Sequence, residues 1–333
     1  MKRLLLLIIA MFFVAALVMA GGQSEGEVIK IKYAHNQRTG SPQDEGAKLF
    51  KQKIEELSGG RVQVTIYPDN QLGSLREVIE SVQSGQIEMA QQPLGMIANF
   101  APQLNINDLP YLYPSEEVLW KVLDGAMGEK LTGYMNDVGF VNLGYHSGGP
   151  KQFSANIPLR GKADFSKVSL RAMPAPIVIA TFEALGANPV PIEFSELYNS
   201  LQQRVVDGQE NPMQTVSMLN LYEVQKYVTY TNHSWMIYAN IVNKKFWETL
   251  PADVQKLMYQ AMKETAPAQR KLMQNAETEY IREAEKNGCQ VIMLTPAEIE
   301  ALRQLTLPVH NAFIDRIGRD LYNSFVKEIE SLK

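Results

Sequence analysis

Alternating and helical patterns of apolar residues divide the first part of the chain into short strands and helices. Residues 28–33 and 62–66 alternate apolar with polar side chains, which predicts two strands. Residues 46–57 and 75–82 carry apolar side chains at helical spacing. A third strand is predicted over residues 87–90. This β-α-β-α-β order is typical of parallel strands joined by crossover helices, so we expect the start of an α/β sheet.

The same order of elements begins again in the middle of the chain. The pattern predicts a strand over 168–173, a helix over 176–185 and an extended segment over 187–192. A further helix is expected over 195–203, after which Val205-Val206 should lead into a tight turn at Asp207-Gly208. Two successive units of this kind predict a two-lobed α/β protein with a cleft between the lobes.

The last third of the chain is predicted to be mainly helical. A helical pattern runs from 252 to 288, and we expect Pro267 inside it to kink the helix rather than end it. A helix of this length exceeds the diameter of one domain, so it should cross both lobes. Two further helices are expected over 296–305 and 308–332. Between the two units, Gly148-Gly149-Pro150 is the expected hinge, because glycines absorb backbone rotation.

The first twenty residues have the composition of an export signal. Lys2 and Arg3 precede an unbroken apolar run, and small residues follow it, which is typical of a secretory signal peptide. We expect cleavage after Ala20, with residues 21–27 forming a flexible start of the mature chain. The alternative is an uncleaved membrane anchor, for which the run only approaches the minimum length.

Composition excludes several classes of protein. The 333 residues are 45% hydrophobic and 20% charged, as expected for a globular chain of about two domains. A single cysteine, Cys289, excludes an internal disulfide framework and multi-cysteine zinc sites. The net charge of −4 gives no basic face for nucleic acid, so no nucleic-acid partner is expected.

Sequence motifs of catalysis are missing. The chain has no nucleotide-binding, nucleophile-elbow, metalloprotease or calcium-loop motif. Its four histidines are far apart, so we expect structural histidines, no metal site and no cofactor. Cys289 is expected to be a buried inert thiol rather than a nucleophile. These absences favour a binding protein over an enzyme.

Two residues of the central unit are candidates for holding a ligand. Arg171 stands near the carboxyl end of its predicted strand, where open α/β sheets place their ligand crevice, and its guanidinium matches a carboxylate. The alternative is a solvated arginine on an exposed face. Asn211 precedes Pro212 and is therefore held extended, which can aim its amide into a crevice, although residues 209–212 equally fit an ordinary loop.

Several motifs resemble one family, the solute-binding proteins of tripartite ATP-independent periplasmic (TRAP) transporters, the DctP family. In the central unit these are Leu170-Arg171-Ala172-Met173-Pro174, Ala184-Leu185-Gly186-Ala187-Asn188-Pro189, Phe194-Ser195-Glu196-Leu197-Tyr198 and Val206-Asp207-Gly208-Gln209-Glu210-Asn211-Pro212. Outside it they are Tyr67-Pro68, Asn70-Gln71-Leu72-Gly73, Leu109-Pro110-Tyr111, Tyr222-Glu223-Val224-Gln225-Lys226-Tyr227, Thr231-Asn232-His233 and Leu250-Pro251.

The resemblance implies a two-lobed Venus-flytrap receptor that closes on a small organic acid. Its expected lobes are 28–148 with about 237–276, and 149–236 with about 277–333. It also implies delivery of the acid to TRAP membrane permease subunits, a periplasmic location and a monomer. The alternatives are a protein that presents a carboxylate to a sensory receptor and, from a different class, an exported hydrolase or lyase.

The resemblance assigns roles to residues of the second lobe. Arg171 is the residue expected to form a salt bridge with the carboxylate, Phe194 to pack on the ligand and Asn211 to bind it. Lys151 stands where the family commonly has a second arginine, and Gln152 follows it as the family pattern expects. Lysine lacks the guanidinium fork, so the acid is expected in a different pose.

Further pocket residues are expected nearer the first lobe. Asn36 matches an asparagine after the first strand. Gln92 lies where some members carry polar pocket residues, although Gln91, Gln92 and Pro93 do not clearly reproduce them. Trp235 and Tyr238 lie near an expected crossing between lobes, and they either stack on the ligand or pack in the core. The sequence leaves open which carboxylate is bound: a sugar acid, keto acid, hydroxy acid, dicarboxylate or aromatic acid.

Overall fold

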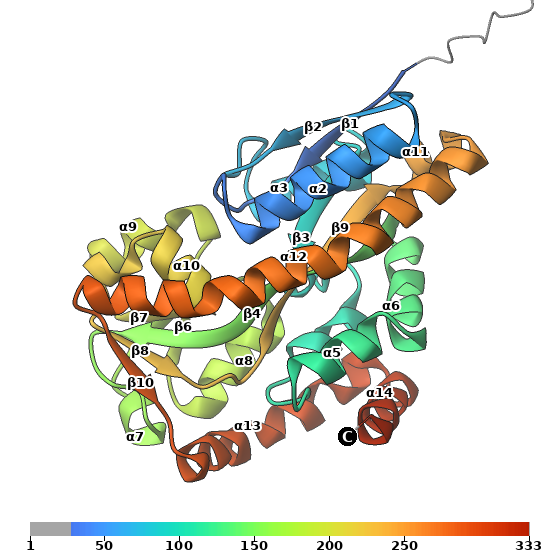
Figure 1. The fold of residues 1–333 in the computed structure, drawn as a ribbon. Coiled ribbons are helices and arrows are strands. Elements are labelled where there is room, and N and C mark those ends of the chain that lie inside the picture. The colour runs from blue at the N-terminus through green and yellow to red at the C-terminus, as the bar shows by residue number, and fades with distance from the viewer. Residues whose placement is uncertain (1–27, 333) are drawn as a thin grey trace, which may run out of the picture.

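A mixed ten-stranded sheet runs through both lobes of the molecule (Figure 1). The computed structural model describes residues 28–332, so the expected signal peptide and flexible start lie outside the described residues. The strand order is β2-β1-β3-β9-β4-β7-β5-β6, and β8 pairs with β4 and β10. The strands are β1 Ile29–Ala34, β2 Val62–Tyr67, β3 Met89–Pro93, β4 Phe140–Ala155, β5 Ser169–Ala172, β6 Asn188–Pro191, β7 Gly208–Pro212, β8 Tyr227–Tyr230, β9 Trp235–Asn243 and β10 Gln290–Met293.

Helices cover the faces of this sheet, which gives the two-lobed α/β fold that the sequence predicted (Figure 1). The α-helices are α2 Pro42–Leu57, α3 Leu75–Ser84, α4 Leu94–Ile97, α5 Glu116–Leu123, α6 Ala126–Asp137, α7 Lys162–Phe165, α8 Pro176–Leu185, α9 Leu197–Gln202, α10 Met213–Met218, α11 Lys244–Thr249, α12 Ala252–Lys286, α13 Pro296–Ile317 and α14 Arg319–Ser331. Short 3-10 segments are η1 Pro102–Asp108, η2 Phe194–Glu196 and η3 Leu221–Glu223.

The first β-α-β-α-β unit is confirmed, since β1 pairs in parallel with both β2 and β3. Its first helix begins earlier than predicted, at Pro42 instead of Gly46. Ser41 caps α2 by accepting a hydrogen bond from the Asp44 amide at 3.1 Å, and Pro42 occupies the first turn, where proline costs nothing. The first turn carries polar residues, so apolar spacing alone did not reveal it.

The second unit is also parallel, because β5 pairs with β6 and β7. The predicted turn at Asp207-Gly208 lies earlier than expected, over residues 203–207: Gly208 already begins β7, and the Asp207 carboxylate accepts a hydrogen bond from the Ser169 amide at 2.8 Å. Residues 209–212 form a strand rather than a loop, because β7 is hydrogen-bonded between β4 and β5 and is buried along its whole length. Strand β7 is buried by β4 and β5, which are distant in sequence, so its own residues do not reveal that it is a strand.

Strand β4 and helix α12 extend along both halves of the sheet. The first part of β4 pairs with β9, and its last residues pair with β7 and β8. Gly148-Gly149-Pro150 lies inside β4 next to a register shift, and Gly149 has φ +92°. Its hinge role stays a prediction. Helix α12 packs on α2 and on α10, so the predicted long helix with Pro267 inside it is confirmed (orange in Figure 1).

The C-terminal helices differ from the prediction. We expected a break at Pro308, but α13 continues through it to Ile317, and the chain turns at Gly318, where φ is +94°. Thr306 and Val309 beside the proline are buried, so packing holds the helix together despite the lost hydrogen bond. Since α13 contacts both η1 and α8, and α14 contacts α5, the expected lobe boundaries stay a prediction.

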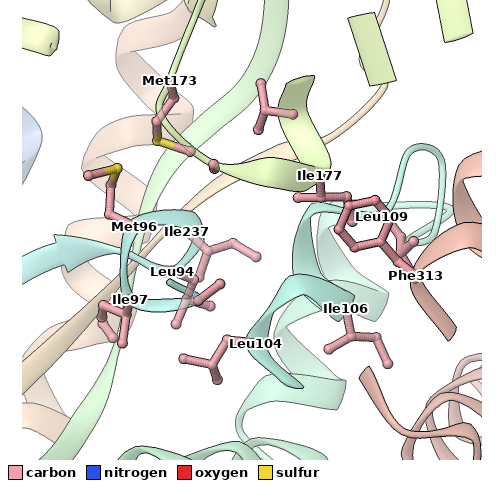
Figure 2. Packing of buried hydrophobic residues seen from close by; sticks show 14 of the residues in the cluster. Leu94, Met96, Ile97, Leu104, Ile106, Leu109, Met173, Ile177, Ile237 and Phe313 are labelled. Atoms are coloured by element: carbon pink, nitrogen blue, oxygen red, sulfur yellow. The ribbon is translucent and has the colours of Figure 1, made fainter. Parts of the chain in front are cut away.

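Apolar side chains bring the two halves of the molecule together beside the cleft. Figure 2 shows Met96 of α4 and Met173, which follows β5, lying close to one another within the largest hydrophobic cluster. A Cβ atom on Gly95 would lie 2.6 Å from the Cε atom of Met173, so a side chain at this position would force the flexible end of the methionine to move. This contact places β5 next to the ends of β3 and β9, which sets the position of the site.

Candidate functional site

A small cavity lies where the two halves of the sheet meet. It has a volume of about 10 Å³, which is space for about one water molecule, and we call it the inner cavity. Its walls come from the ends of β3, β5, β7 and β9, from the segments that follow β1 and β5, and from the first residues of α3 and η2. The lining residues are Asn36, Leu75, Pro93, Arg171, Met173, Phe194, Glu210, Asn211, Met236 and Tyr238.

A larger depression of about 500 Å³, the outer groove, lies next to the inner cavity. Asn36 and Phe194 line both of them. One wall of the groove consists of residues 36–38 and 69–70, and the other of residues 194–199 and 215–223. Parallel strands of open α/β sheets end at such a crevice, which makes this the expected position for a ligand.

Arg171 is the central charged group of the inner cavity. Its side chain is 2% exposed, so the alternative of a solvated surface arginine is wrong. Its Nε atom donates a hydrogen bond to the Ile192 carbonyl at 2.8 Å, whereas its Nη2 atom has no partner among the described residues. Burial lowers the pKa of Arg171 to about 10, while Glu210 and Glu193 act in the opposite direction. The group therefore stays cationic at neutral pH and has an unused donor.

Lys151 differs from Arg171 because its charge is matched within the protein. Its Nζ atom lies 2.7 Å from Asp108 Oδ1 and 3.4 Å from Glu210 Oε1, and the side chain is 1% exposed. Burial by itself lowers the pKa of Lys151, but the two carboxylates outweigh it and the pKa is raised. Lys151 does not line the inner cavity. It ties η1 to the central strands β4 and β7.

Glu210 connects this ion pair to the cavity wall. Its Oε1 atom also contacts His233 Nε2 at 3.1 Å, and His233 stacks on Phe153 with ring centroids 4.6 Å apart. Burial by itself raises the pKa of Glu210, but Lys151 and His233 outweigh it and lower the pKa. Glu210 is therefore a fixed anion at the cavity.

Gln152 stabilises the backbone near the site instead of facing the cavity. Its Oε1 atom accepts hydrogen bonds from the amides of Thr231 and Asn232 at 2.8 and 3.1 Å, and its Nε2 atom donates to Asn232 Oδ1 at 2.6 Å. Asn232 has φ +45°, a conformation that these three bonds stabilise. Gln152 does not line the inner cavity and fixes the turn between β8 and β9.

The remaining predicted residues divide into two groups. Asn36, Phe194, Asn211 and Tyr238 line the inner cavity together with Arg171, as five predicted residues from five separate segments. Gln92 and Trp235 do not line it. Gln92 is buried with an unpartnered Oε1 atom, and Trp235 packs against the largest hydrophobic cluster.

The polar residues of the lining keep hydrogen-bonding capacity. The Tyr238 hydroxyl accepts a hydrogen bond from Gln37 Nε2 at 2.8 Å, and burial raises the pKa of Tyr238. Asn211 Nδ2 donates to Gln209 Oε1 at 2.6 Å. Asn36 Oδ1 is buried without a partner among the described residues. These groups can fix the orientation of a polar ligand.

Five lining residues were not predicted from the sequence, namely Leu75, Pro93, Met173, Glu210 and Met236. Glu210 and Met173 lie within the quoted motifs but received no role. Met236 and Tyr238 alternate along β9 and therefore point to the same face, so the signal for Met236 is its place two residues before Tyr238 in this strand. No signal in the sequence indicated Leu75.

The described part of the chain has neither a candidate metal site nor a candidate membrane span. Residues 28–332 contain no cluster of three or more His, Cys, Asp or Glu side chains suited to a metal ion. In the same range no helix is both apolar and long enough for a membrane span. Cys289 is buried, and burial raises its pKa to about 11, so the thiol is protonated at neutral pH.

Comparisons with known proteins identify the family to which the chain belongs. The model of bacterial extracellular solute-binding protein family 7, DctP, matches residues 33–316. A C4-dicarboxylate-binding periplasmic protein DctP of Rhodobacter capsulatus is 34% identical over 296 residues, which covers 88% of this chain and 89% of that protein.

Two solved structures have the same fold. A TRAP periplasmic solute-binding protein from Desulfovibrio salexigens with bound orotic acid has a TM-score of 0.89 and 30% identity, and covers 91% of this chain and 99% of its own. One from Shewanella oneidensis with bound succinate has a TM-score of 0.86 and 29% identity, and covers 90% and 99%. The chain therefore belongs to the DctP family of TRAP solute-binding proteins, as its motifs predicted.

Proposed function

We propose that this receptor captures a small organic acid between its lobes and that Arg171 binds the acid's carboxylate. The observation that carries the proposal is a buried guanidinium with an unused Nη2 donor. Burying a charge without a partner is costly, and a ligand carboxylate would offset this cost with two parallel hydrogen bonds. The orotic acid and succinate bound to the two similar structures each carry carboxylates.

The other lining residues would hold the rest of the acid. Phe194 would pack on it, while Asn36, Asn211 and Tyr238 would hydrogen-bond to it. Lys151 would contribute indirectly, by positioning Glu210 and β7. This assignment departs from the expected direct contact of Lys151 with the acid.

Binding requires the lobes to separate. An inner cavity of about 10 Å³ is too small for an organic acid, which has several heavy atoms. The acid would enter through the outer groove while the lobes are apart, with rotation in β4 at Gly148-Gly149-Pro150. Closure would then exclude water and strengthen the contact with Arg171. The closed receptor would deliver its ligand to the membrane permease of a TRAP transporter.

The location and assembly of the protein complete the proposal. Residues 1–20 would direct export and be removed after Ala20, so that the mature chain works in the periplasm as a monomer. The N-terminal sequence of protein purified from the periplasm tests export and cleavage after Ala20. The mass of the protein in solution tests whether it is a monomer.

The test of the carboxylate site is a binding experiment with one buried and one exposed arginine. Succinate, D-galactonate and orotate are first screened by thermal shift, and the tightest binder is then measured by calorimetry. We expect Arg171→Gln to lose 2 to 5 kcal/mol of binding free energy, on the order of 30-fold or more. The control Arg204→Gln changes an exposed arginine of the same lobe and should bind normally. Undiminished affinity in Arg171→Gln, with both variants folded, contradicts the proposal.

A further inference from the structure

We propose that the ligand is a monocarboxylate whose remainder is uncharged and carries hydroxyl groups, rather than a dicarboxylate. This inference rests on the proposed function, since it takes Arg171 as the carboxylate site. It concerns what the opposite side of the same cavity can accept.

The first argument is the number of free positive charges. Among the described residues, Arg171 is the one cation in the lining of the inner cavity. The other buried cation nearby, Lys151, is held between Asp108 and Glu210 at 2.7 and 3.4 Å. One unpaired cation therefore faces the ligand, and it is sufficient for one carboxylate.

The second argument is the negative charge around the cavity. Glu210 is itself a lining residue, 3% exposed and ionised. Glu193 also acts electrostatically on Arg171, and its Oε2 atom is buried without a partner in the described part of the chain. A second ligand carboxylate would be buried near these anions with no cation to match it, and like charges in such a site are strongly disfavoured.

The outer groove does not provide the missing cation. Its lining includes Arg38, but also Asp69 and Glu223. Arg38, Asp69 and Glu223 are all exposed, so water screens all three charges. A dicarboxylate extending from Arg171 toward the groove would thus meet, among the described residues, no buried cation for its second carboxylate.

The third argument is the kind of hydrogen-bonding group left over. Asn36 Oδ1 is a buried acceptor without a partner among residues 28–332, and Glu210 offers acceptor oxygens as well. A hydroxyl group can donate to such acceptors, whereas an ionised carboxylate cannot donate. Leu75, Met173 and Met236 supply apolar contact for the carbon chain.

The inference separates this receptor from relatives with similar sequences. The Rhodobacter capsulatus protein, 34% identical, is a C4-dicarboxylate-binding protein. Direct transfer of that ligand class predicts a preference for succinate, which is the reverse of the preference inferred from the cavity charges.

The test uses pairs of acids that share a carbon skeleton and differ in one terminal group. The pairs are 4-hydroxybutanoate and succinate, threonate and tartrate, and galactonate and galactarate, each measured by calorimetry at pH 7.5. In the pair with the tightest binder, we expect the monocarboxylate to bind at least about 30-fold more tightly than the dicarboxylate. Equal or tighter binding of the dicarboxylate overturns the inference, as does failure of all six acids to bind at 1 mM.

Variants separate this inference from the proposed function. If a dicarboxylate is preferred and Arg171→Gln abolishes its binding, the carboxylate site stands and only the inference fails. If Arg171→Gln leaves all binding unchanged, the proposed function fails.

A second pair of variants tests the role of negative charge. Glu210→Gln should reduce the discrimination against the dicarboxylate by about tenfold, whereas Glu223→Gln in the outer groove should not. Unchanged discrimination in a folded Glu210→Gln protein contradicts the charge argument. If that variant does not fold, the comparison of acid pairs on the unmodified protein decides alone.

Discussion

The ion pair of Lys151 provides a quantitative test of what holds the centre of this protein together. Replacing Lys151 with methionine keeps an unbranched apolar side chain that is one atom shorter and removes the charge. Asp108 and Glu210, which lie 2.7 and 3.4 Å from the Nζ atom, then remain as two buried carboxylates without a cation between them. Breaking a buried pair by removing one partner costs about 3 to 5 kcal/mol. This is a large part of the roughly 5 to 15 kcal/mol that stabilises a typical domain.

The assay is equilibrium unfolding in urea at several pH values. At neutral pH we expect Lys151→Met to lose about 4 kcal/mol of unfolding free energy. Without Lys151, Glu210 loses the largest effect that lowers its pKa and keeps only that of His233, so its pKa in the folded state rises relative to the unmodified protein. The stability lost by the variant is greatest where Glu210 is ionised, and the loss disappears as pH falls and the carboxyl group takes up a proton. The deficit should therefore shrink on acidification.

A surface lysine supplies the matched control for this experiment. Lys167 is 64% exposed in its side chain and lies 3.3 Å from Asp164, so Lys167→Met should cost less than about 1 kcal/mol. A Lys151→Met protein within about 1 kcal/mol of the unmodified protein at pH 7.5 would refute the reasoning. So would a deficit that does not change with pH.

Two further predictions concern acid stability and backbone packing. Burial, with smaller effects of Arg270 and His35, lowers the pKa of His146 to about 3, so below pH 6.5 the unfolded chain takes up the proton first and stability falls. At pH 5 the loss of unfolding free energy from His146 amounts to about 2 kcal/mol. His146→Gln should therefore lose less stability than the unmodified protein between pH 7 and pH 5, measured by unfolding in urea. The same loss in both proteins contradicts this prediction. A Cβ atom at Gly208 would lie 2.2 Å from the Ser154 carbonyl oxygen, so Gly208→Ala should cost at least about 2 kcal/mol by thermal unfolding. Gly161→Ala, where nothing lies within 4 Å, is the control, and equal melting temperatures for the two variants would count against this packing.

Local patterns were sufficient for much of the secondary structure. The segment 176–185 was predicted with the bounds that α8 has, because its apolar spacing ends at Gly186, which adopts the left-handed conformation of a helix cap. The β-α-β-α-β order was predicted for the same reason, since alternation and helical spacing are properties of neighbouring residues. The break predicted at Pro308 is wrong because the packing of its buried neighbours, which a single residue type does not indicate, keeps α13 continuous.

Local patterns did not predict the strands that depend on pairing with distant segments of the chain. Strand β4 contains glycines and polar residues and shows no simple alternation, yet it is a strand because β9, β7 and β8 supply hydrogen-bond partners along its length. Strand β7 also depends on its neighbours: its residues fit a loop, but pairing with β4 and β5 makes them a strand. A strand between two others is determined by its partners more than by its own residues.

The sequence by itself determined the fold class, the family and the identity of Arg171 as the candidate carboxylate site, because these depend on local periodicity and on a contiguous motif. The tertiary structure alone decided that Arg171 keeps a free donor while Lys151 is neutralised. The physical reason is distance along the chain: Asp108 lies 43 residues from Lys151, and only folding brings the two charges to 2.7 Å. The charges available to a ligand are those that remain after such internal pairs have formed.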